Sequence, residues 1–376
     1  MAEKMAEVYG AYDLQINQVM RGRGAFVLRT DKGIFQIKPM DVNPSRLEAE
    51  YEFKESLAQL GFDSIDYCVK NVDGELYTCD RYGNPYVMRR FFLGRECNPQ
   101  SYQDIVLGVR NLAKLHQVGR KAFEKIEKDV HIRVTGDFKK RNQSLKRVNN
   151  YILRQKSKRE FEMKYLKTFD YFYQQGNMCQ REFEGLLQME RAREDARGLV
   201  REETGENVRG EAAGANREMA IGAASEMAAG ANREVVAGDE KCGSHLGYCH
   251  GMYNHHSIVI TSDAVGTISF DKFYLGNQLD DLYHYARKMV EKNDHSFSVL
   301  TTILDEYGAI NPLSREDYQY IYINYCYPEK LYKLGNQYMN GSKSWLSPKL
   351  LEKMNKFIQD EGKKQEILDR MQKMYL

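Results

Sequence analysis

The sequence has few of the features that mark extracellular, metal-binding or membrane proteins. Its 376 residues include seven cysteines, which are scattered, and none of them forms a CxxC pair. That pattern predicts neither a zinc site nor a disulfide framework, and it favours a reducing compartment. Residues 1–14 contain no apolar stretch of signal-peptide length, and no later run could span a bilayer. We therefore expect a protein made in the cytoplasm.

The chain also lacks an excess of charge of either sign. Its formal net charge is +2, which excludes a global attraction to DNA or to a membrane surface. A hydrophobic content of 42% with 11% aromatics indicates a proper core. Tryptophan is almost absent, with one residue against 26 tyrosines. Because tyrosines are frequent at interfaces, this bias hints at an assembly partner.

The N-terminal part combines short β-rich runs with one strong helix signal. Glycine turns separate the runs, which is typical of antiparallel strands. The stretch from about Ser45 to Leu60 has an apolar side and ends before Gly61, a helix stop signal. A small antiparallel sheet with one helix is expected. The expected strands are Gln15–Met20, Ala25–Thr30, Ile34–Lys38, Glu75–Cys79 and Tyr86–Phe92.

From Ser101 onward the hydrophobic period becomes helical, and residues 137–197 also have helical character. Within Lys139–Lys167 eleven basic residues stand against two acidic ones, a local charge of about +9. A solvated helix face is the preferred explanation of this charge, and a docking face for an acidic partner is the alternative. The C-terminal stretch Pro348–Leu376 is amphipathic and predicts a surface helix.

Residues 205–240 differ in kind from the rest of the chain. They contain no aromatic residue, leucine or proline, and the motif AAGANRE occurs at Ala212–Glu218 and again at Ala228–Glu234. Such a segment cannot bury enough apolar surface to offset the entropy of ordering. We expect a low-complexity, disordered or weakly helical insertion.

A β-hairpin is predicted just after this insertion, with Ser257–Thr261 as its first strand, 262–266 as its turn and Thr267–Phe270 as its second strand. His250 and Gly251 precede the hairpin, and Asp271 follows its second strand. A carboxylate at the exit of a buried strand is costly unless it binds a cation or accepts several hydrogen bonds. Asp271 is therefore a candidate metal ligand, although it could instead cap the next turn.

Transfer of a phosphoryl group from ATP would need further parts that the N-terminal part could supply. The turn containing Gly22 and Gly24 could cover phosphates, although a plain tight turn explains it equally well. Lys38 ends the third expected strand, where it could hold phosphates. A glutamate on the following helix could orient Lys38 by ion pairing. The spacing leaves Glu48, Glu50 and Glu52 open, and Glu50 is our choice for the cofactor-binding set.

Motifs along nearly the whole chain, apart from the repeat-bearing insertion, carry a family resemblance. The sequence resembles the CotS-type, kinase-like spore coat proteins of endospore-forming bacteria, within the superfamily of aminoglycoside phosphotransferases and choline kinases. The most discriminating stretches are GRECN at Gly94–Asn98 and DLYHYARK within Asp280–Asn293. The others are RGRGAFVLRTDKGIFQIK, GF at Gly61–Phe62, LAKLH at Leu112–His116, HGMYNHHSI from His250, and SFDKF.

The resemblance implies an α+β, two-lobed, protein-kinase-like fold. Residues 1–93 would form a small β-rich N-lobe and residues 94–376 a mainly helical C-lobe, with the catalytic-loop-like hairpin at 248–273. The superfamily's motif is HGD, four residues, then N. His250 and Gly251 match it, but Met252 occupies the position of the catalytic aspartate.

Ser257 occupies the asparagine position of the same motif, so Asp271 and Ser257 would be the metal positions. Methionine has neither basicity nor affinity for magnesium, and a hydroxyl is a poorer ligand than an amide oxygen. We expect a degenerate phosphotransferase, a pseudokinase with no assignable catalytic residue, in which ATP and magnesium are uncertain cofactors. His255 or His256 could replace the lost base, since an imidazole accepts protons near neutral pH.

By the same resemblance, the protein is expected to be a structural or assembly protein of the spore coat. It would be made in the mother-cell cytoplasm and deposited on the coat, with other coat proteins as partners. An active phosphotransferase for a small hydroxyl substrate or a coat protein is the alternative. A nucleotide-binding regulator unconnected with the coat also stays open. A nucleic-acid partner is not expected, because only the basic stretch would favour one.

Overall fold

The computed structural model describes residues 5–22, 24–124, 132–133, 137–203, 245–341 and 348–376. The predicted insertion at 205–240 lies outside the described residues. The chain divides into two compact units, each of which draws on separate stretches of sequence. Unit 1 comprises residues 1–127, 245–314 and 363–370, and unit 2 comprises residues 128–244, 315–362 and 371–376. The predicted lobe boundary at 93/94 stays a prediction.

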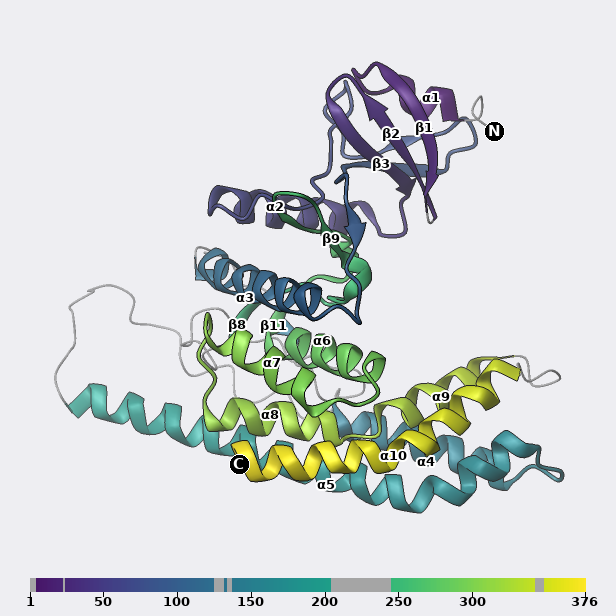
Figure 1. The fold of residues 1–376 in the computed structure, drawn as a ribbon, viewed down its shortest axis with the longest axis vertical. Coiled ribbons are helices and arrows are strands. Elements are labelled where there is room, and N and C mark those ends of the chain that lie inside the picture. The colour runs from purple at the N-terminus through teal and green to yellow at the C-terminus, as the bar shows by residue number, and fades with distance from the viewer. Residues whose placement is uncertain (1–4, 23, 125–131, 134–136, 204–244, 342–347) are drawn as a thin grey trace, which may run out of the picture. The chain divides into compact units, whose positions relative to one another are not determined.

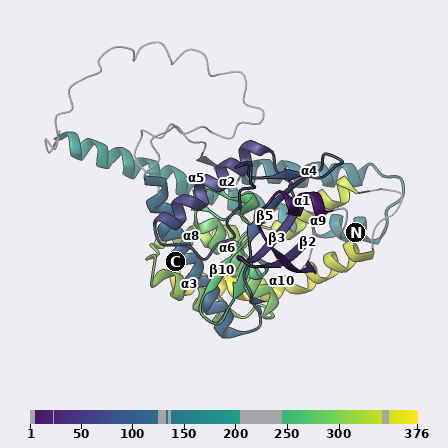
Figure 2. The same cartoon turned by 90° about the horizontal axis from the view of Figure 1, so that it is seen from above.

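Unit 1 begins with a five-stranded antiparallel sheet of order β1-β2-β3-β5-β4 (Figure 1). Seen from above, β2, β3 and β5 lie side by side (Figure 2). Leu28, Ile37 and Met88 contribute their fully buried side chains to one core. The short helix α1 packs on this core through Val8. The strands are β1 (Ile16–Gly22), β2 (Ala25–Thr30), β3 (Gly33–Pro39), β4 (Thr78–Cys79) and β5 (Pro85–Arg90), and α1 is Ala6–Gly10.

One predicted strand of this sheet is much shorter than expected. Only Thr78 and Cys79 of the stretch 75–79 pair with β5. The beginning of the stretch is instead hydrogen-bonded to Asn71, whose side-chain Oδ1 accepts from the Glu75 N–H at 2.8 Å. The Asn71 N–H also donates to the Glu75 carbonyl at 2.9 Å. These bonds fold the residues into a turn and keep them out of the sheet.

Helix α2 (Pro44–Gln59) follows the sheet and agrees with the predicted helix to within one residue at each end. Asn43 caps its start, accepting a hydrogen bond from Arg46 N–H at 2.8 Å, and Pro44 occupies the first turn. Gly61, at a φ of +86°, lets the chain leave the helix. The helix buries Leu47, Glu50, Phe53, Lys54 and Leu57, so two charged side chains lie in its buried face.

The rest of unit 1 is mainly helical and carries the predicted hairpin. The hairpin pairs β9 (Ile258–Ile260) with β10 (Val265–Thr267). Its second strand therefore lies earlier than predicted, since Ser269 takes a left-handed φ of 70° and Phe270–Lys272 forms a 3-10 helix. The other elements of this unit are β6 (Arg95–Glu96), α3 (Tyr102–Glu124), β8 (Leu246–Cys249), a 3-10 helix at His255–Ser257, β11 (Tyr274–Asn277), α6 (Leu279–Lys292) and α7 (Phe297–Gly308).

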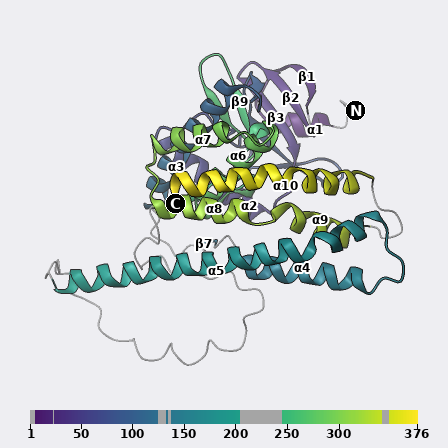
Figure 3. The same cartoon turned by 60° about the horizontal axis from the view of Figure 1, so that its bottom comes forward.

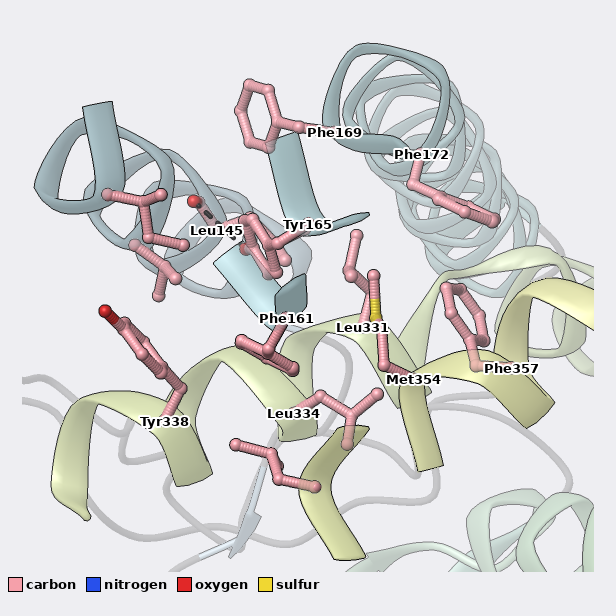
Figure 4. Packing of buried hydrophobic residues seen from close by; sticks show 13 residues of the cluster. Leu145, Phe161, Tyr165, Phe169, Phe172, Leu331, Leu334, Tyr338, Met354 and Phe357 are labelled. Carbon is pink, nitrogen blue, oxygen red and sulfur yellow. Dashed lines mark hydrogen bonds between the residues drawn. The ribbon is translucent and has the colours of Figure 1, made fainter. Parts of the chain in front are cut away.

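Unit 2 is a helical assembly, in which α4 lies alongside α5 (Figure 3). Its core packs Phe161 and Tyr165 of α5 against Leu334 and Tyr338 of α9, with Met354 of α10 (Figure 4). The predicted C-terminal helix is confirmed as α10. The elements of this unit are β7 (Ile132–Arg133), α4 (Phe138–Leu153), α5 (Glu160–Glu203), α8 (Arg315–Cys326), α9 (Glu329–Asn340) and most of α10 (Pro348–Tyr375).

Tyrosine is a core residue in this protein. The largest fully buried side chains include Tyr165, Tyr253, Tyr285, Tyr307 and Tyr327. Their hydroxyls reach internal partners; Tyr285, for example, donates to the Ile105 carbonyl at 2.9 Å. The high tyrosine content therefore does not by itself indicate an assembly surface. No helix in the described part of the chain is long and apolar enough to cross a membrane.

Candidate nucleotide and phosphoryl-transfer site

The loop that follows β8 carries His250, Gly251 and Met252, and a buried carboxylate holds its backbone. The His250 N–H donates to Asp281 Oδ2 at 2.5 Å, and the Gly251 N–H donates to Asp281 Oδ1 at 2.9 Å. Gly251 has a φ of +81°, and a Cβ there would lie 2.0 Å from the Lys272 carbonyl oxygen. Only glycine fits this position, because the loop runs directly against the segment that contains Asp271.

His250 is a brace within this loop. Its Nε2 lies 3.0 Å from the Ile268 carbonyl, which can only accept, so Nε2 carries the proton. Its Nδ1 accepts from the Met252 N–H at 3.2 Å. Burial lowers the pKa of His250, which keeps the ring neutral. Both ring nitrogens are therefore engaged in holding the hairpin and the loop together.

Asp281, at the start of α6, is the residue that organises the loop. Besides the two backbone donors, it lies 3.4 Å from His116 Nε2, and His116 Nδ1 lies 2.8 Å from the Tyr307 hydroxyl. Burial alone would raise the pKa of Asp281, but hydrogen bonds from His116 and Gly251 hold it below its usual value. Asp281 was not among the site residues predicted from the sequence. Its only signal was the DDLYHYARK motif, in which an acidic residue at a helix start usually faces solvent.

The Met252 side chain contributes little to the packing of the loop. Met252 is 54% exposed, although the next residue, Tyr253, is buried. Tyr253 donates its hydroxyl hydrogen to the Gly108 carbonyl at 2.8 Å and anchors the loop to α3. The loop is thus complete in its backbone and its supports, and it presents an apolar thioether at its exposed position.

Ser257, a predicted metal position, uses its hydroxyl group locally. Ser257 Oγ accepts from the Asn254 N–H at 2.9 Å and donates to the Asn254 carbonyl at 2.8 Å. Asn254 Oδ1 in turn accepts from the His256 N–H at 2.9 Å. These bonds form a capping box around the 3-10 helix 255–257. The side chain is buried in this turn and closes it.

His255 and His256, the two candidate substitutes for a lost base, lie on this same 3-10 helix with their ring centroids 3.9 Å apart. His256 Nδ1 lies 3.0 Å from Glu96 Oε2 at the surface. Burial, with the neighbouring charge of His256, lowers the pKa of His255 to about 4. A group with that pKa is a weak proton acceptor at neutral pH, which disfavours His255 as the replacement.

Asp271 lies in the 3-10 helix Phe270–Lys272, and two cations contact its carboxylate. Lys38 Nζ, at the end of β3, lies 3.0 Å from both Asp271 oxygens. Arg89 Nη1, from the neighbouring strand β5, donates to Asp271 Oδ1 at 3.1 Å. Burial would raise the pKa of Asp271, but Arg89 and Lys38 outweigh it and bring the pKa down to about 2. Lys38 and Asp271, each named from the sequence as a candidate site residue, are thus in contact, and their cofactor and metal roles stay predictions.

Glu50, one of the three glutamates that were left open as partners of Lys38, does not pair with it. Its two oxygens are taken by Lys54 Nζ at 2.6 Å and by Arg89 Nη2 at 2.9 Å. Among the described residues no ion pair joins Lys38 to Glu48, Glu50 or Glu52. The physical reason is that Arg89, buried beside Lys38 on the adjacent strand, reaches Glu50 and Asp271 with one guanidinium group.

Gly22 and Gly24 lie at the turn between β1 and β2, where Gly22 pairs with Ala25. Gly24 has a φ of +69°, which favours glycine in a tight hairpin turn. The turn geometry alone explains why position 24 is a glycine, and no bound ligand is needed to explain it. Their role in covering phosphates stays a prediction.

The family described as "Spore coat putative kinase YutH" matches residues 5–177. Over these residues, which make up less than half of the chain, the predicted resemblance to the spore coat kinase-like proteins is confirmed. No curated protein matches the sequence.

Solved structures share the fold of this kinase-like chain. An aminoglycoside phosphotransferase from Alicyclobacillus acidocaldarius superposes with a TM-score of 0.72 at 15% identity, covering 98% of this chain and 95% of its own. Spectinomycin phosphotransferase APH(9)-Ia, in complex with ADP and spectinomycin, gives 0.59 at 10% identity, covering 99% and 98%. Amicoumacin kinase hAmiN, in complex with AMP-PNP and Ca²⁺, gives 0.52 at 12%, covering 98% and 93%. The predicted α+β, kinase-like fold is confirmed.

The residues of this kinase-like site fit a magnesium ion poorly. Magnesium requires several oxygen ligands in octahedral geometry. The predicted ligand Asp271 already contacts Lys38 and Arg89, and Ser257 Oγ closes its capping box. Within the described ranges, no group of three or more His, Cys, Asp or Glu side chains is arranged to hold a metal. The donor set therefore disagrees with the metal site that the resemblance implied.

Proposed function

We propose that the protein is a structural or assembly protein of the spore coat that has a kinase-like fold and performs no phosphoryl transfer. The observation that carries this proposal is Met252. It occupies the exposed position of a loop whose backbone is otherwise fully supported by Asp281 and Gly251. A thioether can neither accept the proton of a substrate hydroxyl nor orient that hydroxyl as a carboxylate does.

Neighbouring side chains do not compensate for this loss. His250 uses both ring nitrogens, and the pKa of His255 is about 4. His256 lies against Glu96 at the surface. A general base typically contributes a factor of ~10²–10⁴ in rate, so its loss alone would reduce phosphoryl transfer severely.

Association with the spore coat is inferred from the family whose description matches residues 5–177. Production in the mother cell with later deposition on the coat, and coat proteins as partners, belong to the same proposal. Helix α4 offers a basic face for an acidic partner, with Lys139, Lys146 and Arg147 exposed. The same face could also simply be solvated, and binding to an acidic coat protein would distinguish the two.

An active phosphotransferase is the second candidate, and the contact between Lys38 and Asp271 favours it. In a kinase-like site, a lysine and a carboxylate at this separation could hold a nucleotide's phosphates and their metal. The substrate would then be a small hydroxyl compound or a coat protein, with a displaced residue as the base.

The two candidates differ in ATP turnover by the purified full-length protein. With ATP and Mg²⁺ we expect wild type to release ADP no faster than the Asp271→Ala variant does. The proposal fails if wild type shows magnesium-dependent turnover that disappears in Asp271→Ala and persists in Met252→Ala. Met252→Asp tests the history of the position, because a gain of turnover in that variant would identify the group that wild type lacks.

A further inference from the structure

Three carboxylates converge on the guanidinium group of Arg89. Its Nη2 lies 2.9 Å from Glu50 Oε2, and its Nη1 lies 3.1 Å from Asp271 Oδ1 and 3.6 Å from Asp66 Oδ2. The three acids come from α2, from the chain that follows α2, and from the 3-10 helix after the hairpin. One planar cation thus joins three parts of unit 1.

The Arg89 side chain is fixed in this position. Its backbone lies in β5, paired with Gln36 of β3 and bridged to Cys68 on the other side. The side chain is only 2% exposed, against 21% for Lys38 and 29% for Asp271. A guanidinium group carries its donors in a rigid plane and stays charged, so it cannot leave this position by losing a proton.

The surrounding charges are balanced without any added ion. The cluster consists of the cations Lys38, Lys54 and Arg89 and the anions Glu50, Asp66 and Asp271. Lys54 neutralises Glu50 and Asp66 at 2.6 and 2.7 Å. A divalent cation at Asp271 would therefore add two positive charges to a neutral, largely buried cluster and would have to compete with Lys38 and Arg89, which already contact that carboxylate.

Asp66 ties this cluster to the backbone that carries Asp271. Its Oδ2 accepts from the N–H of Ser269 at 2.9 Å, in the left-handed residue that turns the chain into the 3-10 helix. The position of Asp271 is thus set by the same network that Arg89 completes. The carboxylate faces an internal cation because the fold holds it there.

We propose that the guanidinium group of Arg89 is a built-in replacement for the divalent cation at Asp271. The native protein then binds no magnesium at this site, and a nucleotide that enters it binds as the metal-free anion. This inference goes beyond the proposed function, because it concerns the cation at Asp271 and holds whether or not phosphate is transferred.

The first experiment measures metal binding by the full-length protein without nucleotide. Mn²⁺ is titrated against wild type and Asp271→Asn, with binding followed by calorimetry. We expect no saturable site in the millimolar range that distinguishes the two proteins. Saturable Mn²⁺ binding to wild type that is lost in Asp271→Asn would overturn the proposal.

The second experiment removes the internal cation. Arg89→Ala leaves three carboxylates with one fewer counter-charge, so we expect a fall in melting temperature of roughly 5–10 °C. Mn²⁺ should then raise the melting temperature of Arg89→Ala, while it leaves wild type unchanged. Arg90→Ala is the matched control, since Arg90 is the next residue on β5 and is exposed. An Arg89→Ala variant that melts like Arg90→Ala, or that gains nothing from Mn²⁺, would contradict the proposal.

A third variant covers the case in which Arg89→Ala does not fold. Arg89→Lys keeps the charge but replaces the planar fork with a single ammonium group. We expect it to fold with a melting temperature below that of wild type and to show no Mn²⁺ binding. Mn²⁺ binding by Arg89→Lys would show that charge at this position does not exclude the metal.

Nucleotide binding separates this inference from the proposed function. If a melting-temperature shift with ATP occurs, we expect it to be equal in Mg²⁺ and in EDTA. A shift that requires Mg²⁺ would overturn the inference even without turnover. Conversely, turnover that persists in EDTA would overturn the proposed function and leave the inference standing.

Discussion

The loop around His250 and the cluster around Asp271 belong to one candidate site, but they differ in what is kept. The loop keeps its backbone supports, and the cluster keeps its charged side chains. In the loop the backbone supports are intact, while Met252 provides no chemical function at the exposed position. In the cluster the charged groups remain, but they are paired with one another through Arg89. Both arrangements keep the fold of the site, and under the proposed function both limit what the site can do to a substrate.

The difference shows which interactions fold this part of the molecule. Asp281 and Gly251 are needed to bring the loop against the segment 270–272, whatever the loop does chemically. The cluster is needed to bury Glu50 and Lys54 without leaving a charge unpaired. The residues that support the loop backbone or form ion pairs are present. Methionine stands at the exposed position, where the side chain supports neither the loop nor an ion pair.

The largest effect is expected from Gly251→Ala. The new methyl group would overlap the Lys272 carbonyl oxygen in a left-handed backbone, so we expect a loss of about 3 kcal/mol or more in unfolding free energy. Denaturant unfolding of the full-length protein measures it. Gly83→Ala is the control, because Gly83 has a similar φ of +79° but no atom within 4 Å of a Cβ. Its loss should be about 1 kcal/mol, the cost of the backbone conformation alone.

Equal losses in Gly251→Ala and Gly83→Ala would show that the loop can move away from Lys272. In that case the tight supports of the loop would not distinguish it from an ordinary surface turn. The loop would then not be held in place as firmly as the Asp271 cluster.

A smaller effect is expected from acid, and it tests the cluster. The pKa of Asp271 is about 2 in the folded protein and near 3.8 without these interactions. A depressed carboxyl pKa stabilises the fold above the unfolded value, so this stability is complete above about pH 4 and is lost as the pH falls toward 2. The amount is about 2 kcal/mol. Denaturant unfolding at several pH values should show it in wild type and not in Asp271→Asn.

If Asp271→Asn and wild type lose stability in parallel between pH 4 and 2, Arg89 and Lys38 do not hold the carboxylate as the structure places them. Other acids also have lowered pKa values, among them Asp104, whose carboxylate accepts hydrogen bonds from Arg95. The difference between the two proteins is therefore the quantity to compare.

The elements of the fold that local signals define were predictable from sequence. Asn43, Pro44 and Gly61 mark the ends of α2, and the glycine turns mark β1, β2 and β3. The end of the hairpin was not predictable, because Thr267–Phe270 has strand-like residues while Ser269 takes a left-handed conformation held by distant Asp66. A single bond across the fold decided that boundary.

The candidate site was predictable where the family motif carries it, and not where pairing depends on tertiary structure. Lys38 and Asp271, both named from the sequence, contact each other, and the His250 ring contacts the Ile268 carbonyl three residues before Asp271. The partner of Glu50 was missed, because Arg89 is 39 residues away in the chain and only the tertiary structure brings the two side chains together. Asp281 was missed because nothing in the sequence separates a buried acid at a helix start from an exposed one.

The smallest effect on stability is expected from substitutions of Met252. Because its side chain is half exposed, Met252→Ala and Met252→Asp should each change the unfolding free energy by less than about 0.5 kcal/mol. Denaturant unfolding of the two Met252 variants is compared directly with that of Gly251→Ala, the variant at the preceding residue. A loss above about 1 kcal/mol in both variants would mean that the methionine packs against something and is kept for stability. A negligible loss would mean that the fold tolerates a carboxylate here, so that the absence of one in this chain reflects its function and not a constraint of its structure.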